Sequence, residues 1–262
     1  MRTELVTEPG DPSRPNEDFA GVGLPASGQG GCAILLDGVT PPRDGTGCLH
    51  TVPWFTSRLG GALTELTLSS RDLTLPEVLS RAIGRTSEAH ANTCDLSHPR
   101  TPQATVVLAR WSADTLDYLV LSDSALLLRS PAGTVTPVLD DRLGRLPRSA
   151  LATDALVDAT LRNKEGGFFT AAADPSVAGR AVTGTVPRHE VRALTALTDG
   201  ATRWTEKFRE GDWTALFDLV AKEGARSLVD RVRELESADL QERTFPRRGK
   251  AHDDATVLYV EL

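Results

Sequence analysis

Apolar residues follow two different periods in the first third of the chain, and they predict a hairpin followed by two helices. Compact apolar runs at residues 19–24 and 32–36 flank a glycine- and serine-rich turn at 26–31, as in two paired strands. Over residues 50–68, and again over 75–94, apolar residues recur every three or four positions. This spacing predicts two amphipathic helices.

The middle of the chain predicts more strands, and its last part predicts a second pair of helices. Four compact apolar segments separated by turn residues predict an antiparallel meander; they cover residues 104–111, 118–121, 125–129 and 134–139. Residues 141–190 show no regular period and are interpreted as an irregular excursion from the core, followed by a strand at 190–197. Helical spacing returns at 213–220 and 225–235, and a strand at 255–262 follows.

The order of these elements favours an α+β fold. Strands, two helices, strands, two helices and a final strand show no regular βαβ alternation, which favours a layered sandwich of antiparallel sheets. The 262 residues are 40% hydrophobic and 25% charged, so the chain can bury a sizeable core. We therefore expect one domain over residues 1–262.

Charge and the lack of long apolar stretches narrow the choice of partners. The formal net charge of -7 argues against nucleic acid as the main partner, because clustered Lys and Arg bind phosphate backbones. The longest basic tract, Arg247-Arg248-Gly249-Lys250, is interpreted as a solvated loop, although its place before an acidic cluster leaves a substrate-facing role open. No signal-like apolar region follows the first residues, and no stretch approaches the roughly 18 apolar residues that span a bilayer. A cytoplasmic protein without a membrane partner is expected.

The three cysteines carry no recognisable pattern. Cys32, Cys48 and Cys94 are well separated and form no CxxC pair, so neither a disulfide framework nor a thiolate zinc site is predicted. We expect all three to be reduced thiols.

Four acidic positions lie at the ends of predicted strands. Asp37, Asp123 and Asp199 each follow an apolar run, and Asp253-Asp254 precedes the last one. Aspartates at strand ends emerge at the rim of a sheet, and converging carboxylates would repel one another unless a cation neutralised them. Oxygen ligands of this kind suit Mg²⁺ or Mn²⁺ rather than zinc. A single Asp-Gly pair is more simply explained as a tight turn, but two such pairs, each at a strand end, favour a metal site.

Six short motifs along nearly the whole chain carry a family resemblance. They are Arg14-Pro15-Asn16-Glu17-Asp18, Leu36-Asp37-Gly38, Pro102-Gln103-Ala104-Thr105-Val106-Val107, Leu121-Ser122-Asp123-Ser124, Leu197-Thr198-Asp199-Gly200 and Asp253-Asp254-Ala255-Thr256-Val257. In this order they resemble the motifs of the protein phosphatase 2C (PPM) family of metal-dependent serine/threonine phosphatases, in a divergent, bacterial form. The resemblance implies a four-layer αββα sandwich (PP2C-like), with residues 141–190 as its flap.

The resemblance also implies a metal centre. By carry-over Asp37 bridges two Mg²⁺ or Mn²⁺ ions, the Gly38 carbonyl binds one of them, and Asp199 and Asp253 bind the other. Asp123 together with Asp199 is the candidate for holding a third, weaker ion.

The implied activity is hydrolysis of a phosphomonoester in a phosphorylated protein, on phosphoserine or phosphothreonine, by a metal-bridging hydroxide. Glu17 and Asp18 would orient metal-bound waters, and Arg14 would bind the phosphate. Arg203 and Arg43 are the fallback candidates for that last role.

Two departures from the family pattern motivate an alternative. Val39-Thr40-Pro41-Pro42 replaces the small-residue turn that usually follows the first Asp-Gly, and Arg14 lies one residue nearer Asp18 than the family's phosphate-binding arginine. The alternative is a catalytically degenerate module of the same fold, serving as a regulatory or phosphopeptide-binding protein.

Overall fold

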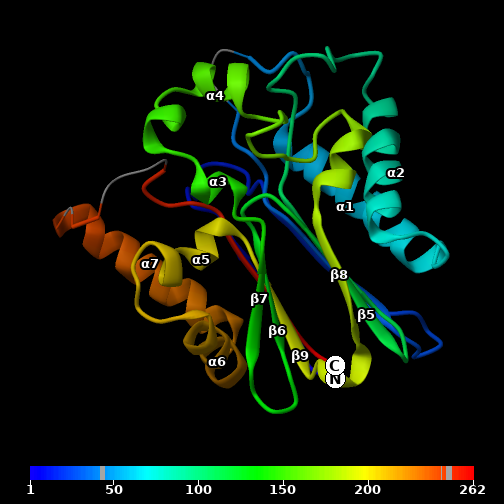
Figure 1. Cartoon of the computed structure of the whole chain (residues 1–262). Helices are drawn as coiled ribbons and strands as arrows, with labels where there is room; N and C mark the ends of the chain where they lie inside the picture. Colours follow the sequence, from blue (N-terminus) through cyan, green and yellow to red (C-terminus); the bar gives the residue numbers. More distant parts are fainter. Residues whose placement is uncertain (42–44, 243, 246–249) are drawn as a thin grey trace.

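Two five-stranded antiparallel sheets lie face to face between two layers of helices (Figure 1). The computed structural model describes residues 1–41, 45–242, 244–245 and 250–262. The first sheet has the order β1-β10-β9-β6-β7, and the second has the order β2-β3-β4-β5-β8.

The strands come from all parts of the chain. In the first sheet they are β1 (Thr3–Glu8), β10 (Ala255–Glu261), β9 (Ala193–Leu197), β6 (Ala125–Arg129) and β7 (Val135–Leu139). In the second sheet they are β2 (Phe19–Gly23), β3 (Gly31–Leu36), β4 (Val106–Trp111), β5 (Thr115–Leu121) and β8 (Val182–Pro187).

Helices cover the outer face of each sheet. The second sheet is covered by α1 (Val52–Ser69) and α2 (Leu75–Glu88), and the first by α5 (Asp199–Glu206), α6 (Trp213–Glu223) and α7 (Ala225–Glu242). The segment between β7 and β8 carries α3 (Arg142–Arg145), α4 (Asp154–Thr160) and 3₁₀ turns at Arg148–Leu151 and Pro175–Arg180, and a third turn at Arg188–Glu190 precedes β9. None of the helices in the described part of the chain is long and apolar enough to cross a membrane.

Strand β3 shows why the central strands are continuous apolar runs. Its side chains alternate between two cores: Ile34 and Leu36 pack with the helices α1 and α2, whereas Ala33 and Leu35 pack against the other sheet. Every residue of the strand is buried because both faces of the sheet are covered. The four-layer α+β sandwich predicted from the sequence is confirmed.

Most predicted elements are confirmed with shifted ends. The first hairpin is β2 paired with β3, and the two predicted helices are α1 and α2. Helix α2 ends at Glu88 rather than near residue 94. Its start is fixed by a capping box, in which the Thr74 hydroxyl accepts from the Glu77 backbone and the Glu77 carboxylate accepts from the Thr74 backbone.

The predicted four-stranded meander is wrong. Strands β4 and β5 belong to the second sheet, whereas β6 and β7 belong to the first. The chain crosses between the sheets at Ser122, whose φ of 70° lies in the left-handed region that residues other than glycine rarely adopt. The Ser122 backbone N–H donates to the buried Asp140 carboxylate at 2.9 Å, which holds this turn. The apolar pattern marks the strands but not the sheet that each joins.

Besides the short helices and 3₁₀ turns between β7 and β9, three elements were not predicted. Strand β8 lies inside the stretch interpreted as irregular, so the excursion is shorter than 141–190, and it pairs with β5 at the edge of the second sheet. Strand β1 is an edge strand with alternating exposed and half-buried residues. Helix α5 begins at Asp199, two residues after β9 ends. Edge strands and an eight-residue helix leave weak periodic signals.

The cysteine prediction is wrong for two of the three residues. Cys48 and Cys94 form a disulfide, with their Cα atoms 4.3 Å apart. Cys32 is a free thiol, and its side chain is buried under α1 and α2.

The packing between the sheets generates a test of this architecture. Leu258 on β10 is fully buried in the core between the sheets. We expect Leu258→Ala to lower the free energy of unfolding by about 2–5 kcal/mol, through lost burial and the cavity left behind. Urea denaturation measures it, with Leu156→Ala, at a residue that is 40% exposed, as the control. A loss no larger than that of the control would contradict tight packing between the sheets.

Candidate metal centre

The predicted strand-end aspartates converge where the two sheets meet. Asp37 directly follows β3, Asp123 lies in the crossing from β5 to β6, and Asp199 opens α5 after β9. The backbone N–H of Asp199 donates to the Asp37 carboxylate at 3.3 Å, which joins the ends of strands from different sheets. Asp253, just before β10, lies near enough to act on the charge of both Asp37 and Asp199.

The glycines of the two Asp-Gly pairs serve close approach rather than tight turns. Neither Gly38 nor Gly200 has a left-handed φ. A Cβ atom on Gly38 would clash with the backbone carbonyl oxygen of Glu17, and one on Gly200 would clash with that of Asp254. The absent side chains therefore let each Asp-Gly segment pack against another acidic segment.

Hydrogen bonds hold the remaining acidic segment in place. The Asp254 carboxylate accepts from the Gly10 and Glu17 backbone N–H groups, at 2.8 and 2.7 Å. The Thr40 hydroxyl donates to Glu17, and the Thr256 hydroxyl donates to Asp18 at 2.6 Å. The other Asp18 oxygen, Oδ1, is buried; in the described part of the chain it has no hydrogen bond of normal geometry, although Thr198 lies nearby.

Burial and mutual repulsion raise the pKa of these carboxyls. Burial first, and then Asp199 and Asp18, raise the pKa of Asp37 well above its ordinary value. Burial and then Asp253 raise the pKa of Asp199 to about 8, and burial raises that of Asp18 to about 7. Burial also raises the pKa of Asp123. Such values indicate a buried excess of negative charge.

Two cations partly neutralise one edge of the cluster. The Lys250 ammonium lies 2.8 Å from one Asp253 oxygen and 3.7 Å from Glu17. The Arg203 guanidinium lies 3.0 Å from the other Asp253 oxygen and also pairs with Glu236. Burial lowers the pKa of Lys250, but Asp253 and Glu17 outweigh it, so the pKa is raised. Asp253 is therefore ion-paired in this structure.

The donor set fits divalent cations that prefer oxygen. Its atoms are carboxylate oxygens on rigid strand ends, one of them the buried Asp18 Oδ1 without a normal hydrogen bond. Their spacing is wide: among the described residues, the one group of three or more potential ligands with donor atoms all within 4.8 Å is Cys48, His90 and Cys94. The donor oxygens of the carboxylates therefore lie farther apart in this structure than the donor atoms of that group.

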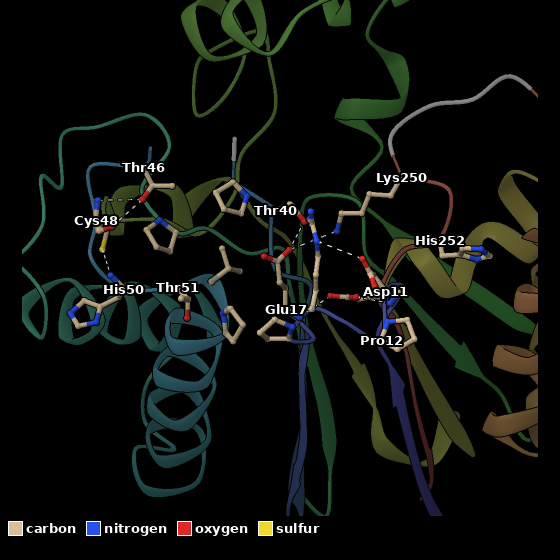
Figure 2. A pocket seen from close by; sticks show the side chains of 18 of the residues that line it. Asp11, Pro12, Glu17, Thr40, Thr46, Cys48, His50, Thr51, Lys250 and His252 are labelled. Atoms are coloured by element: carbon tan, nitrogen blue, oxygen red, sulfur yellow. Dashed lines mark hydrogen bonds and ion pairs between the residues drawn. The ribbon is translucent and has the colours of Figure 1, made fainter. Parts of the chain in front are cut away.

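Two cavities, each of about 750 Å³, flank the segment that carries Asp253 and Asp254. The first is lined by Arg14, Glu17, Thr40 and Lys250, and Figure 2 shows Lys250 reaching toward Glu17. Asp123, Asp199 and Asp253 line the second, together with residues between β7 and α4. Solvent and small molecules can therefore approach the carboxylates from two sides.

Comparisons with solved structures identify the fold. No protein-family model matches the chain, and no curated protein matches it in sequence. The serine/threonine phosphatase Stp1 from Staphylococcus aureus superposes with a TM-score of 0.60 at 13% identity, over 99% of this chain and 94% of that one. PstP/Ppp from Mycobacterium tuberculosis gives 0.57 at 18% identity, over 100% and 98%. PppA, a regulatory component of the type VI secretion system in Pseudomonas aeruginosa, gives 0.59 at 17%, over 99% and 96%.

The chain has the fold of the bacterial serine/threonine phosphatases. The fold implied by the resemblance to protein phosphatase 2C is thereby confirmed over the full length of the described chain. At these identities the likeness concerns the fold, so the roles of individual residues rest on the geometry of the site.

The two candidate arginines that the structure describes, Arg14 and Arg203, differ in exposure. Arg14 is exposed, lines the first cavity with Glu17, and its guanidinium approaches Asp11 at 3.7 Å. Arg203 is buried and held by Glu236 and Asp253. Arg43 lies outside the described residues, as do Arg247, Arg248 and Gly249 of the basic tract. Of the described arginines proposed for phosphate, Arg14 is the accessible one.

Sequence reasoning named Asp254 and Lys250, in the acidic pair and in the basic tract, but gave neither of them a role in the centre. Asp254 ties the segment before β2 to β10, and Lys250 contacts Asp253 and Glu17. The signal for Lys250 was its position three residues before Asp253, at the end of a basic tract.

The raised pKa values predict how stability depends on pH. Asp18 and Asp199 keep a proton in the folded state up to about pH 7 and about pH 8, whereas an unfolded aspartate loses it near about pH 4. The folded state therefore binds more protons, and the metal-free protein loses stability as the pH rises through this window. Melting temperatures between about pH 5.5 and 8.5 with a chelator measure the fall.

Asp199→Asn should make that fall shallower, because asparagine acquires no charge. The exposed Asp114→Asn is the matched control and should leave the slope unchanged. An equally steep fall in Asp199→Asn would show that this carboxyl does not titrate as the geometry predicts.

Proposed function

We propose that the chain is a metal-dependent phosphomonoester hydrolase that removes phosphate from phosphoserine or phosphothreonine in proteins. The observation that carries the proposal is the convergence of Asp37, Asp199 and Asp18 from both sheets, with raised pKa values, next to Glu17, which lines a cavity together with Arg14. The phosphatase fold of the solved neighbours supports the same class of reaction.

The strand ends supply the proposed metal ligands. Asp37 and the Gly38 carbonyl would hold two Mg²⁺ or Mn²⁺ ions, because Asp37 lies between the segments of Glu17 and Asp199. Asp199 and Asp253 would complete the set, and Asp123, which lines the same cavity as Asp199, would hold a third ion. Ions held there would supply an activated water and neutralise charge on the phosphoryl group.

The other residues of the chain position substrate and water. Arg14 binds phosphate oxygens from the rim of the first cavity, where its guanidinium can donate to two oxygens at once. Glu17 and Asp18 accept hydrogen bonds from water and hold it in line with the phosphorus. Thr40 and Thr256 fix the orientation of these two carboxylates through their hydroxyl groups.

The direct test is hydrolysis of p-nitrophenyl phosphate with and without Mn²⁺. We expect Mn²⁺-dependent turnover, and we expect Asp37→Asn and Asp199→Asn each to lower it by at least about a hundredfold, since loss of even an outer-shell partner of a metal costs 10- to 100-fold. Asp114→Asn should keep full turnover. Folded protein without any Mn²⁺-dependent turnover would contradict the hydrolase proposal. Full turnover in Asp199→Asn would contradict the assignment of Asp199 as a metal ligand.

One observation favours the second candidate, the catalytically degenerate module that serves as a regulatory or phosphopeptide-binding protein. Asp253, a proposed metal ligand, is already paired with Lys250 and Arg203. A resident ammonium group beside Glu17 and Asp253 competes with a divalent ion for the same oxygens.

Lys250→Met tests this competition. We expect the Mn²⁺ concentration for half-maximal thermal stabilisation to fall by at least about tenfold, because a positive charge in contact with a ligand repels a divalent ion. Lys222→Met removes a lysine from a comparable pair with Asp218 on α6 and should leave that concentration unchanged. An unchanged Mn²⁺ dependence in Lys250→Met would show that Lys250 does not oppose the metal. If Mn²⁺ stabilised Lys250→Met but not the wild-type protein, the result would favour the catalytically degenerate module.

A further inference from the structure

A second group of potential metal ligands lies behind one wall of the first cavity, away from the carboxylates, and one of its members, Cys48, lines that cavity. Cys48, His90 and Cys94 have their donor atoms within 4.8 Å of one another, and the Cys48 sulfur lies 3.3 Å from His90 Nδ1. Cys48 comes from the loop before α1, and the other two come from the turns after α2. Figure 2 shows Cys48 and His50 on the opposite side of the cavity from Lys250 and His252.

The backbone around the two sulfurs suits thiolates. The Leu49 N–H donates to the Cys94 sulfur at 3.3 Å, and the His50 N–H donates to the Cys48 sulfur at 3.4 Å. Donors directed at sulfur stabilise its negative form, as they stabilise other buried anions. Each sulfur thus receives a backbone hydrogen bond whose strength would increase on reduction to the thiolate.

The burial and the contacts of the His90 ring suit a metal ligand. The His90 side chain is 2% exposed, and burial lowers its pKa, which favours the neutral form that binds metals. One ring nitrogen faces Cys48, and the other, Nε2, is buried with no hydrogen-bond partner in the described part of the chain. The ring of Trp54 lies 5.3 Å away and the ring of His50 lies 5.9 Å away, which restricts its rotation.

We propose that, once the Cys48–Cys94 disulfide is reduced, the two thiolates and His90 bind one zinc ion, at a site distinct from the carboxylate centre. Reduction by a thiol consumes two reductant thiols and returns two cysteine thiols and one oxidised reductant disulfide. Zinc then displaces the two thiol protons, and His90 binds through its neutral Nδ1. Thiolate and imidazole are the ligands that zinc prefers, whereas Mg²⁺ and Mn²⁺ prefer carboxylate oxygen.

The zinc site would hold together one wall of the cavity. It would join the loop before α1, which carries Cys48 and His50 into the cavity lining, to the end of α2. In the oxidised protein the disulfide makes the same connection without a metal. The proposal does not depend on phosphatase activity.

The experiment is titration with Co²⁺ as a spectroscopic substitute for zinc. The wild-type protein, reduced with a phosphine and freed of metal, should take up one equivalent with a thiolate-to-cobalt charge-transfer band and the intense visible absorption of a tetrahedral site. One equivalent of Zn²⁺ should abolish both signals. Co²⁺ held by carboxylates gives no such charge-transfer band, so failure here is distinguishable from failure of the proposed hydrolase.

Variants separate the three ligands from other residues of the same type. Cys48→Ser and Cys94→Ser should lose the charge-transfer band, and His90→Ala should weaken zinc binding by more than about tenfold, since loss of even an outer-shell partner has that effect. Cys32→Ala and His189→Ala, at the free cysteine and at an exposed histidine, should keep the wild-type band.

Two results would overturn the proposal whether or not the variants fold. One is the absence of a charge-transfer band in reduced wild-type protein whose circular dichroism shows native structure. The other is the same band in the oxidised wild-type protein, in which the two sulfurs are bonded to each other. Retention of the full band in folded Cys48→Ser would also exclude this ligand set.

Discussion

Repulsion between buried carboxylates is the constraint on which the rest of this structure depends. Strand ends from both sheets bring Asp18, Asp37, Asp123 and Asp199 together, and burial raises the pKa of each. Bringing ionised groups so close in a water-poor site costs free energy, which the packing of the four layers must offset. A site of this kind is stable only on a scaffold that cannot relax away from it.

The scaffold resists that relaxation through backbone contacts as well as through its cores. At Gly38 and Gly200 a side chain would clash with the backbone of the neighbouring acidic segment, so the chains touch directly there. Asp254 adds two hydrogen bonds between β10 and the segment before β2. The charged groups are therefore positioned by main-chain atoms, which move less than side chains when an ion binds or leaves.

The sequence predicted what depends on local pattern and missed what depends on pairing. Residues 33–36 read as a buried strand because every position is apolar, and Asp37 follows as the point where that strand meets solvent. The sheet that each strand joins is decided at Ser122, by its left-handed backbone and by the hydrogen bond that its N–H donates to the Asp140 carboxylate, and no apolar pattern encodes either. The Cys48–Cys94 contact likewise joins two loops 46 residues apart, and loops carry no period.

Two chemically different donor sets in one molecule raise the question of whether they compete for the same ion. The carboxylates offer hard oxygen atoms, and Cys48, Cys94 and His90 offer sulfur and nitrogen, so Mg²⁺ discriminates strongly in favour of the first set. Zinc can bind either set, but Lys250 would oppose any divalent ion at the carboxylates that it contacts, and among the described ion pairs no cation contacts the sulfurs. The reduced Cys48–Cys94 pair and His90 would therefore bind zinc first, and the carboxylates would bind Mg²⁺ or Mn²⁺. Oxidation of the pair would remove that preference without changing any carboxylate.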